Sequence, residues 1–106
     1  MRRKTLWIKE EYLQAILAGR KRIEVRVGYS NINRMQVGDQ LLLNDIHQYR
    51  VKRIGRYADF AELLEQEEPS AIAPDTPADE LPEKMRAIYP PEKEALGVVA
   101  LEIEPV

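Results

Sequence analysis

Cysteine is absent from this chain of 106 residues, which excludes disulfides, thiolate-bound metals and cysteine nucleophiles. Histidine occurs once, as His47, and a single imidazole without cysteine cannot complete the usual ligand set of zinc. The serines, Ser30 and Ser70, have no neighbouring histidine or glycine elbow, and no glycine-rich phosphate loop is present. The sequence therefore argues against zinc, thiol, serine-triad and P-loop chemistry, and we expect neither a metal nor a cofactor.

Long apolar runs are also lacking. The N-terminal stretch MRRKTLWIKEEY is basic but has no uninterrupted apolar segment of the kind found in signal peptides, and no run reaches bilayer-spanning length. The chain length suits a single hydrophobic core rather than two. We therefore expect one soluble, cytoplasmic domain over residues 1–106, with no membrane partner.

The small net charge of −2 conceals an uneven distribution. Residues 1–57 contain 13 Lys and Arg against 5 Asp and Glu, whereas residues 58–106 contain 3 against 13. If the basic half stays on one surface, that surface can attract a polyanion although the whole chain is acidic. Alternatively, the two halves neutralise each other across their interface, and the sequence leaves both arrangements open.

Helical periodicity appears in three places. Helices are expected over residues 10–19, from an N-cap at Asp59 to a stop at Pro69, and over residues 81–89. Gly19 is expected to end the first of them, because glycine adopts a left-handed conformation without a Cβ clash.

Strand patterns are spread along the whole chain. Strands are expected over residues 5–9, 23–27, 40–44, 48–54 and 97–104, with a bulge near Lys52 and Arg53. Residues 28–39 and the acidic, proline-rich residues 67–80 are expected to be loops. This order favours a closed or nearly closed mixed barrel with helices packed around it.

The segment GRKRIEVR, residues 19–26, is the main cluster of candidate functional side chains. Alternation with apolar residues places Glu24 and Arg26 on one strand face. A carboxylate beside a guanidinium orients its fork for a phosphate or a base edge. Lys21 supplies a point charge or, if its pKa is lowered, a base or nucleophile. The competing interpretation is a solvated strand face with ion pairs worth roughly 0 to 1 kcal/mol each.

Aromatic residues lie in or beside the basic segments. Tyr29, Tyr49 and Tyr57 are candidates for base stacking next to cations, which is how single-stranded nucleic acid is commonly held. For each of them, packing in the core or its rim is the commoner role of a tyrosine. We select Tyr57 for the stacking role and assign Trp7, in the first predicted strand, to the core.

GRKRIEVR fits the pattern GxKxxExR, and in this the chain resembles ASCH domains, a branch of the PUA-like superfamily. The resemblance extends over nearly the whole chain, through IKEEYLQAILAG, the Gly-Asp turn of VGDQLLL, YADFAELL and AIYPPEKEALGVVALEIE. It implies an α+β fold, a PUA-like mixed β-barrel of about five to six strands surrounded by two to four helices. It also implies a cleft between the barrel and the first helix in which the motif residues gather.

By this resemblance, the chain is expected to bind RNA or a nucleotide-like small molecule in that basic cleft. The predicted ligand-binding residues are Lys9, Lys21, Glu24, Arg26 and Tyr57. The residues expected to have structural roles are Gly19 of the motif and Gly38 and Asp39 of the Gly-Asp turn.

Two alternatives remain open. One ASCH branch hydrolyses N4-acetylcytidine with the motif lysine, a threonine and a later glutamate. Here Lys21 matches the lysine, Glu24 replaces the threonine, and the later glutamate has no aligned counterpart. If the chain is an amidohydrolase, Lys21 and Glu24 are its expected catalytic residues. The other alternative is a protein-interaction adaptor in transcription or translation regulation, with residues 67–80 as its docking segment.

Overall fold

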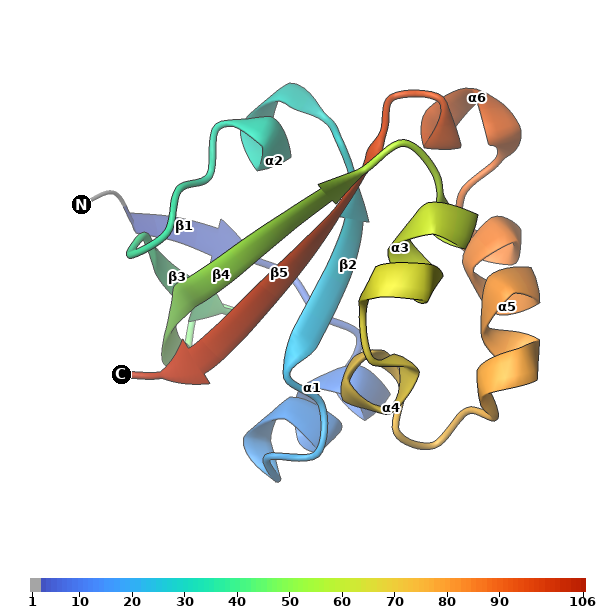
Figure 1. Cartoon of the computed structure of the whole chain (residues 1–106). Helices are drawn as coiled ribbons and strands as arrows, with labels where there is room; N and C mark the ends of the chain where they lie inside the picture. Colours follow the sequence, from blue (N-terminus) through green and yellow to red (C-terminus); the bar gives the residue numbers. More distant parts are fainter. Residues whose placement is uncertain (1–2) are drawn as a thin grey trace.

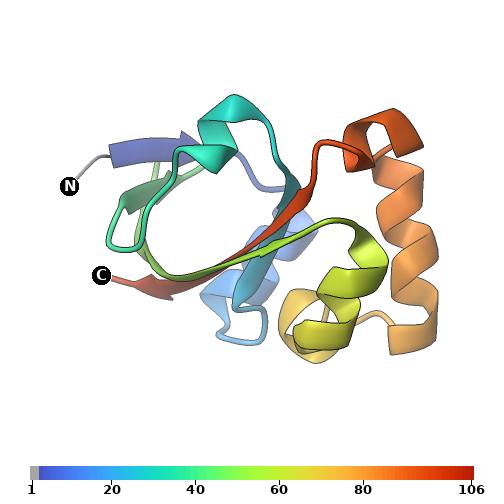
Figure 2. The same cartoon turned by 45° about the horizontal axis from the view of Figure 1, so that its top comes forward.

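A single five-stranded sheet organises the computed structural model, which describes residues 3–106 (Figure 1). Its strand order is β1-β3-β4-β5-β2; β1 pairs with β3 in parallel, and the other neighbouring strands pair antiparallel. The sheet curls into a half-barrel whose edge strands are β1 and β2 (Figure 2). The strands are β1 (Arg3–Leu6), β2 (Ile23–Val27), β3 (Gln40–Leu43), β4 (His47–Tyr57) and β5 (Val98–Pro105). The expected α+β mixed-barrel class is confirmed.

The described residues form six α-helices, more than the two to four expected. They are α1 (Glu10–Leu17), α2 (Ser30–Asn33), α3 (Phe60–Gln66), α4 (Pro69–Ile72), α5 (Leu81–Ile88) and α6 (Pro91–Glu94), with a 3₁₀ turn η1 (Ala78–Glu80) before α5. Of the additional helices, α2 and α4 are single turns within segments expected to be loops, and α6 is a single turn where no element was expected. None of the helices within residues 3–106 is long and apolar enough to cross a membrane.

Pro69 begins a helix instead of ending one. The prediction that it stops the helix capped by Asp59 was wrong, because α3 already ends at Gln66 and Pro69 occupies the first turn of α4. Proline is well tolerated there, since the N–H it lacks would have no intrahelical acceptor. As a result, residues 67–80 form α4 and η1 in addition to loop.

Other local predictions are confirmed. Gly19 has φ +79°, and the N–H groups of Arg20 and Lys21 both donate to the Ala15 carbonyl, which turns the chain from α1 toward β2. The side chain of Asp59 accepts a hydrogen bond of 2.8 Å from the Glu62 N–H and so caps α3.

The Gly-Asp turn before β3 and the bulge in β4 also follow the prediction. Gly38 has φ +93°, and buried Asp39 accepts a 2.9 Å hydrogen bond from the Gln36 N–H. The register between β4 and β5 shifts between Val51 and Arg53, which is the predicted bulge. Beyond this bulge, β4 continues to Tyr57 and is longer than expected.

Strand β5 separates two apolar cores. Val99, Leu101 and Ile103 belong to the core inside the curled sheet, which α1 closes with Leu13 and Ile16. On the opposite face, Val98 and Ala100 belong to a second core beneath α3, α4 and α5. Because both faces of β5 are covered, its apolar residues form a nearly continuous run.

Trp7 does not lie in the core, contrary to prediction. Its exposed fraction is 64%, whereas its neighbours Leu6 and Ile8 are buried. Strand β1 ends at Leu6, and the Asn44 side chain pins the next segment through hydrogen bonds to both the N–H (2.7 Å) and the carbonyl (2.9 Å) of Ile8. With Leu6 and Ile8 directed inward, the intervening Trp7 is directed outward.

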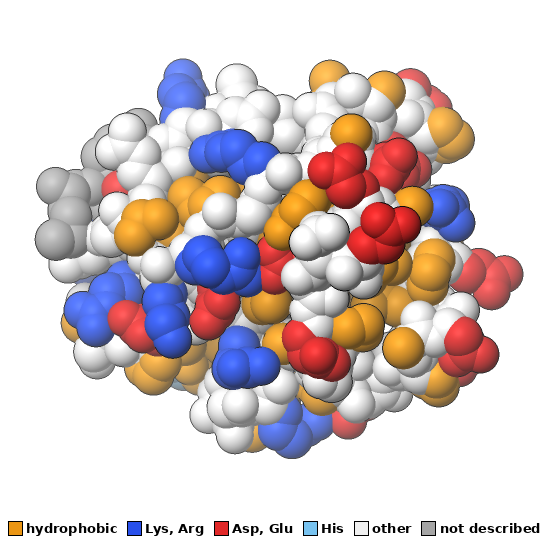
Figure 3. Space-filling view, viewed as in Figure 1, with side chains coloured by type: hydrophobic (Ala, Val, Ile, Leu, Met, Phe, Trp, Pro, Cys, Tyr) orange, Lys and Arg blue, Asp and Glu red, His pale blue; other side chains and the backbone are white. Residues whose placement is uncertain are grey.

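Basic and acidic halves of the chain meet on the sheet. Arg50 pairs with Glu104 at 2.6 Å, and Arg53 pairs with Glu102 at 2.9 Å across the β4–β5 ladder. On the face seen in Figure 3, Lys and Arg gather over the strands and Asp and Glu over the helices, with acidic side chains also between the cations. The neutralising arrangement therefore applies to this part of the basic half.

Candidate functional site

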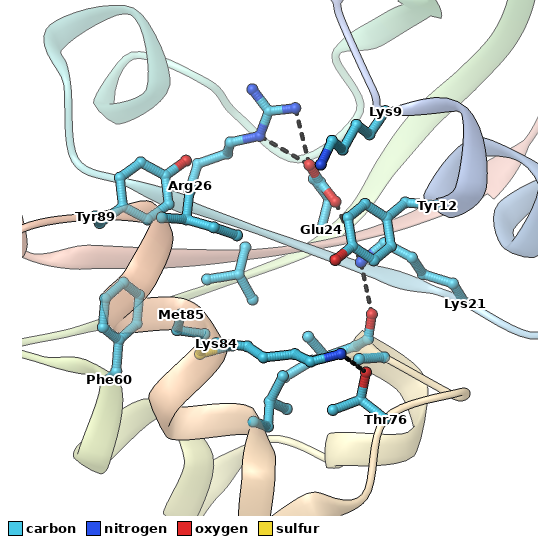
Figure 4. Close-up of a pocket in the computed structure, with 15 residues that line it drawn as sticks. Lys9, Tyr12, Lys21, Glu24, Arg26, Phe60, Thr76, Lys84, Met85 and Tyr89 are labelled. Carbon is cyan, nitrogen blue, oxygen red and sulfur yellow. Dashed lines mark hydrogen bonds and ion pairs between the residues drawn. The ribbon is translucent and has the colours of Figure 1, made fainter.

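A cavity of about 200 Å³ lies at the free edge of β2 (Figure 4). Its other walls are the start of α1, the segment after α4 and the inner side of α5. The charged motif residues lie along β2, while apolar side chains of α4 and α5 face them. The cavity thus has one polar wall and one apolar wall, as small-molecule sites commonly do.

Lys21 is the most buried cation of the cavity wall, with a side chain 4% exposed. Its Nζ donates to the carbonyls of Ile23 (2.6 Å) and Ile72 (2.7 Å) and lies 3.1 Å from Oε1 of Glu24. An ammonium has three N–H groups, and each of these three acceptors can take one. Burial lowers the pKa of Lys21, and the Glu24 carboxylate opposes that shift. Lys21 therefore joins β2 to α4 in addition to facing the cavity.

Glu24 connects Lys21 to Arg26. Nε and Nη2 of Arg26 each lie 2.8 Å from Oε2 of Glu24, and Nη2 also donates to the Trp7 carbonyl at 2.7 Å. The Arg26 side chain is 22% exposed, so the fork is held in place yet remains accessible. The sequence-based expectation that Glu24 orients Arg26 matches this geometry.

Aromatic rings lie at both ends of the cavity. Tyr12 is at the Lys21 end, with Nζ of Lys21 5.8 Å from the ring centroid, a cation–π distance. Tyr89 and Phe60 are at the other end, with ring centroids 6.0 Å apart. Burial raises the pKa of Tyr89 above its ordinary value. A planar ring placed between these ends has aromatic surface available for stacking.

The structure brings together four of the five predicted ligand-binding residues, since Lys9, Lys21, Glu24 and Arg26 all line the cavity. Tyr57 does not line it. Its hydroxyl donates to Glu67, which also accepts two hydrogen bonds from Arg53, so Tyr57 contributes to a buried polar cluster at the end of α3.

Several cavity residues were not predicted from the sequence, among them Tyr12, Thr76, Lys84, Met85 and Tyr89. Tyr12 and Tyr89 lie in segments that match the family, but their periodicity indicated helix packing only. Thr76 and Lys84 come from or follow the acidic, proline-rich segment expected to be a loop, and Lys84 Nζ lies 3.5 Å from the Thr76 hydroxyl. Residues 67–80, which the adaptor alternative assigns to partner docking, thus form part of the cavity wall.

Residues 3–106 contain no group of three or more His, Asp or Glu side chains placed to hold a metal ion. The cavity instead offers a carboxylate, several cations and hydroxyls next to aromatic and aliphatic surface. These groups suit the binding of a planar, polar ring that carries negative charge nearby.

Comparisons with known proteins agree with this architecture. The chain is similar to the crystal structure of hypothetical protein PH0355, with 33% identity, both chains covered in full and a TM-score of 0.89. It is also similar to the solution NMR structure of protein PF0455 from Pyrococcus furiosus, with 33% identity over 100% of this chain and 98% of that one, and a TM-score of 0.79. A search of curated proteins found no significant match.

The fold is shared with the ASCH domain of Lactobacillus crispatus JV V101, at 14% identity over 98% of this chain and 79% of that one, with a TM-score of 0.67. The family model of the ASCH domain matches residues 6–106. This match includes both cores, the GxKxxExR motif and the walls of the cavity. The chain belongs to the ASCH domain family.

Proposed function

We propose that this protein binds single-stranded RNA by accepting one nucleotide in the β2 cavity. The observation that carries the proposal is the largely buried Lys21–Glu24–Arg26 series beside aromatic rings. A volume of about 200 Å³ lies below the roughly 300–1,000 Å³ of sites for drug-sized ligands. The cavity therefore suits a single base better than an extended ligand.

The motif residues have different roles in this proposal. Arg26 and Lys9 lie toward solvent and contact the phosphate or sugar, because their side chains are 22% and 78% exposed. Glu24 accepts from an N–H of the base, since a carboxylate retains acceptor capacity beyond its two cationic partners. Lys21 is a positioning residue that holds Glu24 through the ion pair and holds α4 through the Ile72 carbonyl.

Fluorescence anisotropy with labelled single-stranded RNA at two salt concentrations tests the proposal. Arg26→Ala is expected to weaken binding about tenfold. It is also expected to reduce the slope of log affinity against log salt concentration by about 1, because one phosphate contact is lost. The matched control is Arg22→Ala, which removes the same charge from an exposed side chain four positions away that does not line the cavity. If wild type and Arg26→Ala bind equally weakly without salt dependence, RNA binding by this site is refuted.

A second candidate is hydrolysis of an acylated nucleoside such as N4-acetylcytidine, and the buried Lys21–Glu24 pair favours it. Glu24 would take a proton from water as the water attacks the acyl carbon, and would pass that proton to N4 as the C–N bond breaks, which releases acetate and cytidine. Incubation with N4-acetylcytidine should then yield acetate with wild type and none with Glu24→Gln. No acetate from wild type would leave binding as the function of the cavity.

A further inference from the structure

The free edge of β2 presents backbone groups as well as side chains to the cavity. In an antiparallel pair, alternate residues exchange hydrogen bonds with the partner strand, and the residues between them direct N–H and C=O to the other side. Here the Arg22 carbonyl accepts from the Ile103 N–H, and the Gly28 N–H donates to the Gly97 carbonyl. The backbone N–H and C=O groups of the even-numbered residues of β2 therefore point toward β5. Those of the odd-numbered residues point away from β5, toward the free edge of the sheet.

Val25 is the odd-numbered residue that lines the cavity. On one side of it, the Ile23 carbonyl accepts from Lys21 Nζ at 2.6 Å. On the other side, the Val27 carbonyl accepts from the Tyr29 N–H at 2.8 Å. In the described part of the chain, the hydrogen bonds found outside the β2–β5 ladder do not include the Val25 backbone. Its N–H and C=O thus form an adjacent donor and acceptor on the cavity wall.

We propose that the Val25 backbone recognises the hydrogen-bonding edge of the bound base, an inference that rests on the proposed function and specifies its ligand. The N–H would donate to a ring nitrogen or carbonyl, and the C=O would accept from the neighbouring N–H of the base. All four common bases carry such an adjacent acceptor and donor on their Watson–Crick edge, which proteins read in unpaired RNA. Methylation of the Watson–Crick ring nitrogen removes or blocks one member of this pair.

An extended peptide is a poorer occupant of this edge. A peptide that adds to a sheet needs a series of alternating donors and acceptors along the strand. The carbonyls of Ile23 and Val27 are already bound within the chain, so the edge offers both groups only at Val25. α5 also stands across the cavity from β2, and Met85 and Tyr89 occupy the side on which a further strand would lie (Figure 4). A compact ring fits this geometry.

Titration of ¹⁵N-labelled protein with the four ribonucleoside 5′-monophosphates tests the inference directly. The Val25 amide signal is expected to shift on binding, and its hydrogen exchange is expected to slow. For the nucleotide that binds most tightly, the analogue methylated at its Watson–Crick ring nitrogen should bind at least about tenfold more weakly, because a polar group of the site is left unpaired.

Backbone variants provide an independent test. Val25→Pro removes the N–H, and proline is tolerated on an edge strand where that N–H faces away from the ladder. It should weaken nucleotide binding at least about tenfold, and more than Val25→Ala, which keeps both backbone groups and loses only side-chain contacts with the ligand. If Val25→Pro does not fold, the inference is tested on the wild-type protein alone, by the shift of the Val25 amide signal and by the affinity for the methylated analogue.

Two results would overturn the inference. If a nucleotide binds while the Val25 amide signal stays unchanged, or if the methylated analogue binds equally well, recognition by this backbone is refuted and the proposed function stands. If neither the nucleotides nor single-stranded RNA bind, both proposals fail together.

Discussion

Nζ of Lys21 lies 3.1 Å from Oε1 of Glu24, and their side chains are only 4% and 12% exposed. Burying a charge costs free energy unless the charge is paired and hydrogen-bonded. Each of these two side chains therefore offsets the desolvation cost of the other. The pair connects strand β2, the end of α4 and the Arg26 fork. In this chain, the lysine and the glutamate of the motif therefore have a structural role as a pair.

Lys21→Met should therefore destabilise the fold by about 3 kcal/mol, the lower end of the range for breaking a buried pair, because Arg26 still faces Glu24. Urea unfolding measures this loss. The double variant Lys21→Met/Glu24→Gln should be less destabilised than the sum of the single changes, since it leaves no buried carboxylate. A wild-type unfolding midpoint for Lys21→Met would contradict the role of the pair.

Stability should also fall in acid because of Glu67. Burial acts to raise the pKa of Glu67, but hydrogen bonds from Arg53 and Tyr57 and the charge of Arg53 prevail and lower it. A carboxyl with a lowered folded-state pKa contributes stability above its ordinary pKa, and this contribution is lost as pH falls through the folded-state value. The free energy of unfolding should therefore decrease from about pH 5 downward.

Glu67→Gln should lower stability at pH 7, and the difference from wild type should shrink below about pH 4. Glu65→Gln is the matched control, because Glu65 is an exposed glutamate of α3 only two residues before Glu67. Urea unfolding at several pH values gives both curves. A difference between wild type and Glu67→Gln that stays constant with pH would refute this assignment.

Gly55→Ala should destabilise the protein by about 1–3 kcal/mol through overpacking. A Cβ at this position would lie 2.5 Å from Oε2 of Glu67 and 2.7 Å from the Tyr57 hydroxyl. Gly19→Ala is the comparison, because beyond its chain neighbours no atom lies within 4 Å of its Cβ position and only its φ of +79° opposes alanine, at about 1–2 kcal/mol. Thermal unfolding measures both losses, and nucleotide binding by folded Gly55→Ala should be unchanged.

Trp7→Ala should weaken RNA binding without weakening the fold. The side chain is 64% exposed, while its carbonyl is held by Arg26, which lines the cavity. A neighbouring nucleotide of a bound strand can stack on this ring, so affinity for an oligonucleotide should fall by about 1–3 kcal/mol. Affinity for a mononucleotide should stay the same.

The control for Trp7→Ala is Ile46→Ala, which removes a 72% exposed apolar residue from the turn between β3 and β4. Anisotropy titrations with a short RNA and with a mononucleotide compare the variants. Equal oligonucleotide affinities for wild type and Trp7→Ala would exclude stacking on Trp7.

The sequence by itself determined the features that depend on near neighbours along the chain. Gly19 ends α1 because a positive φ favours glycine, and Asp59 caps α3 through a side-chain bond to an N–H three residues later. Glu24 and Arg26 share a strand face because side chains alternate with a period of two. These rules need no knowledge of the rest of the fold, and they place the motif correctly.

Only the tertiary structure decided which distant segments complete the cavity. Tyr12 and Tyr89 line it because α1 and the C-terminal end of α5 lie at opposite ends of the cavity, and Lys21 reaches the Ile72 carbonyl 51 residues away. Trp7 is exposed and Tyr57 pairs with Glu67 for the same reason, since burial and polar partners depend on how elements pack. Local patterns carry no information on such long-range contacts, and the identity of the cavity walls therefore had to come from the fold.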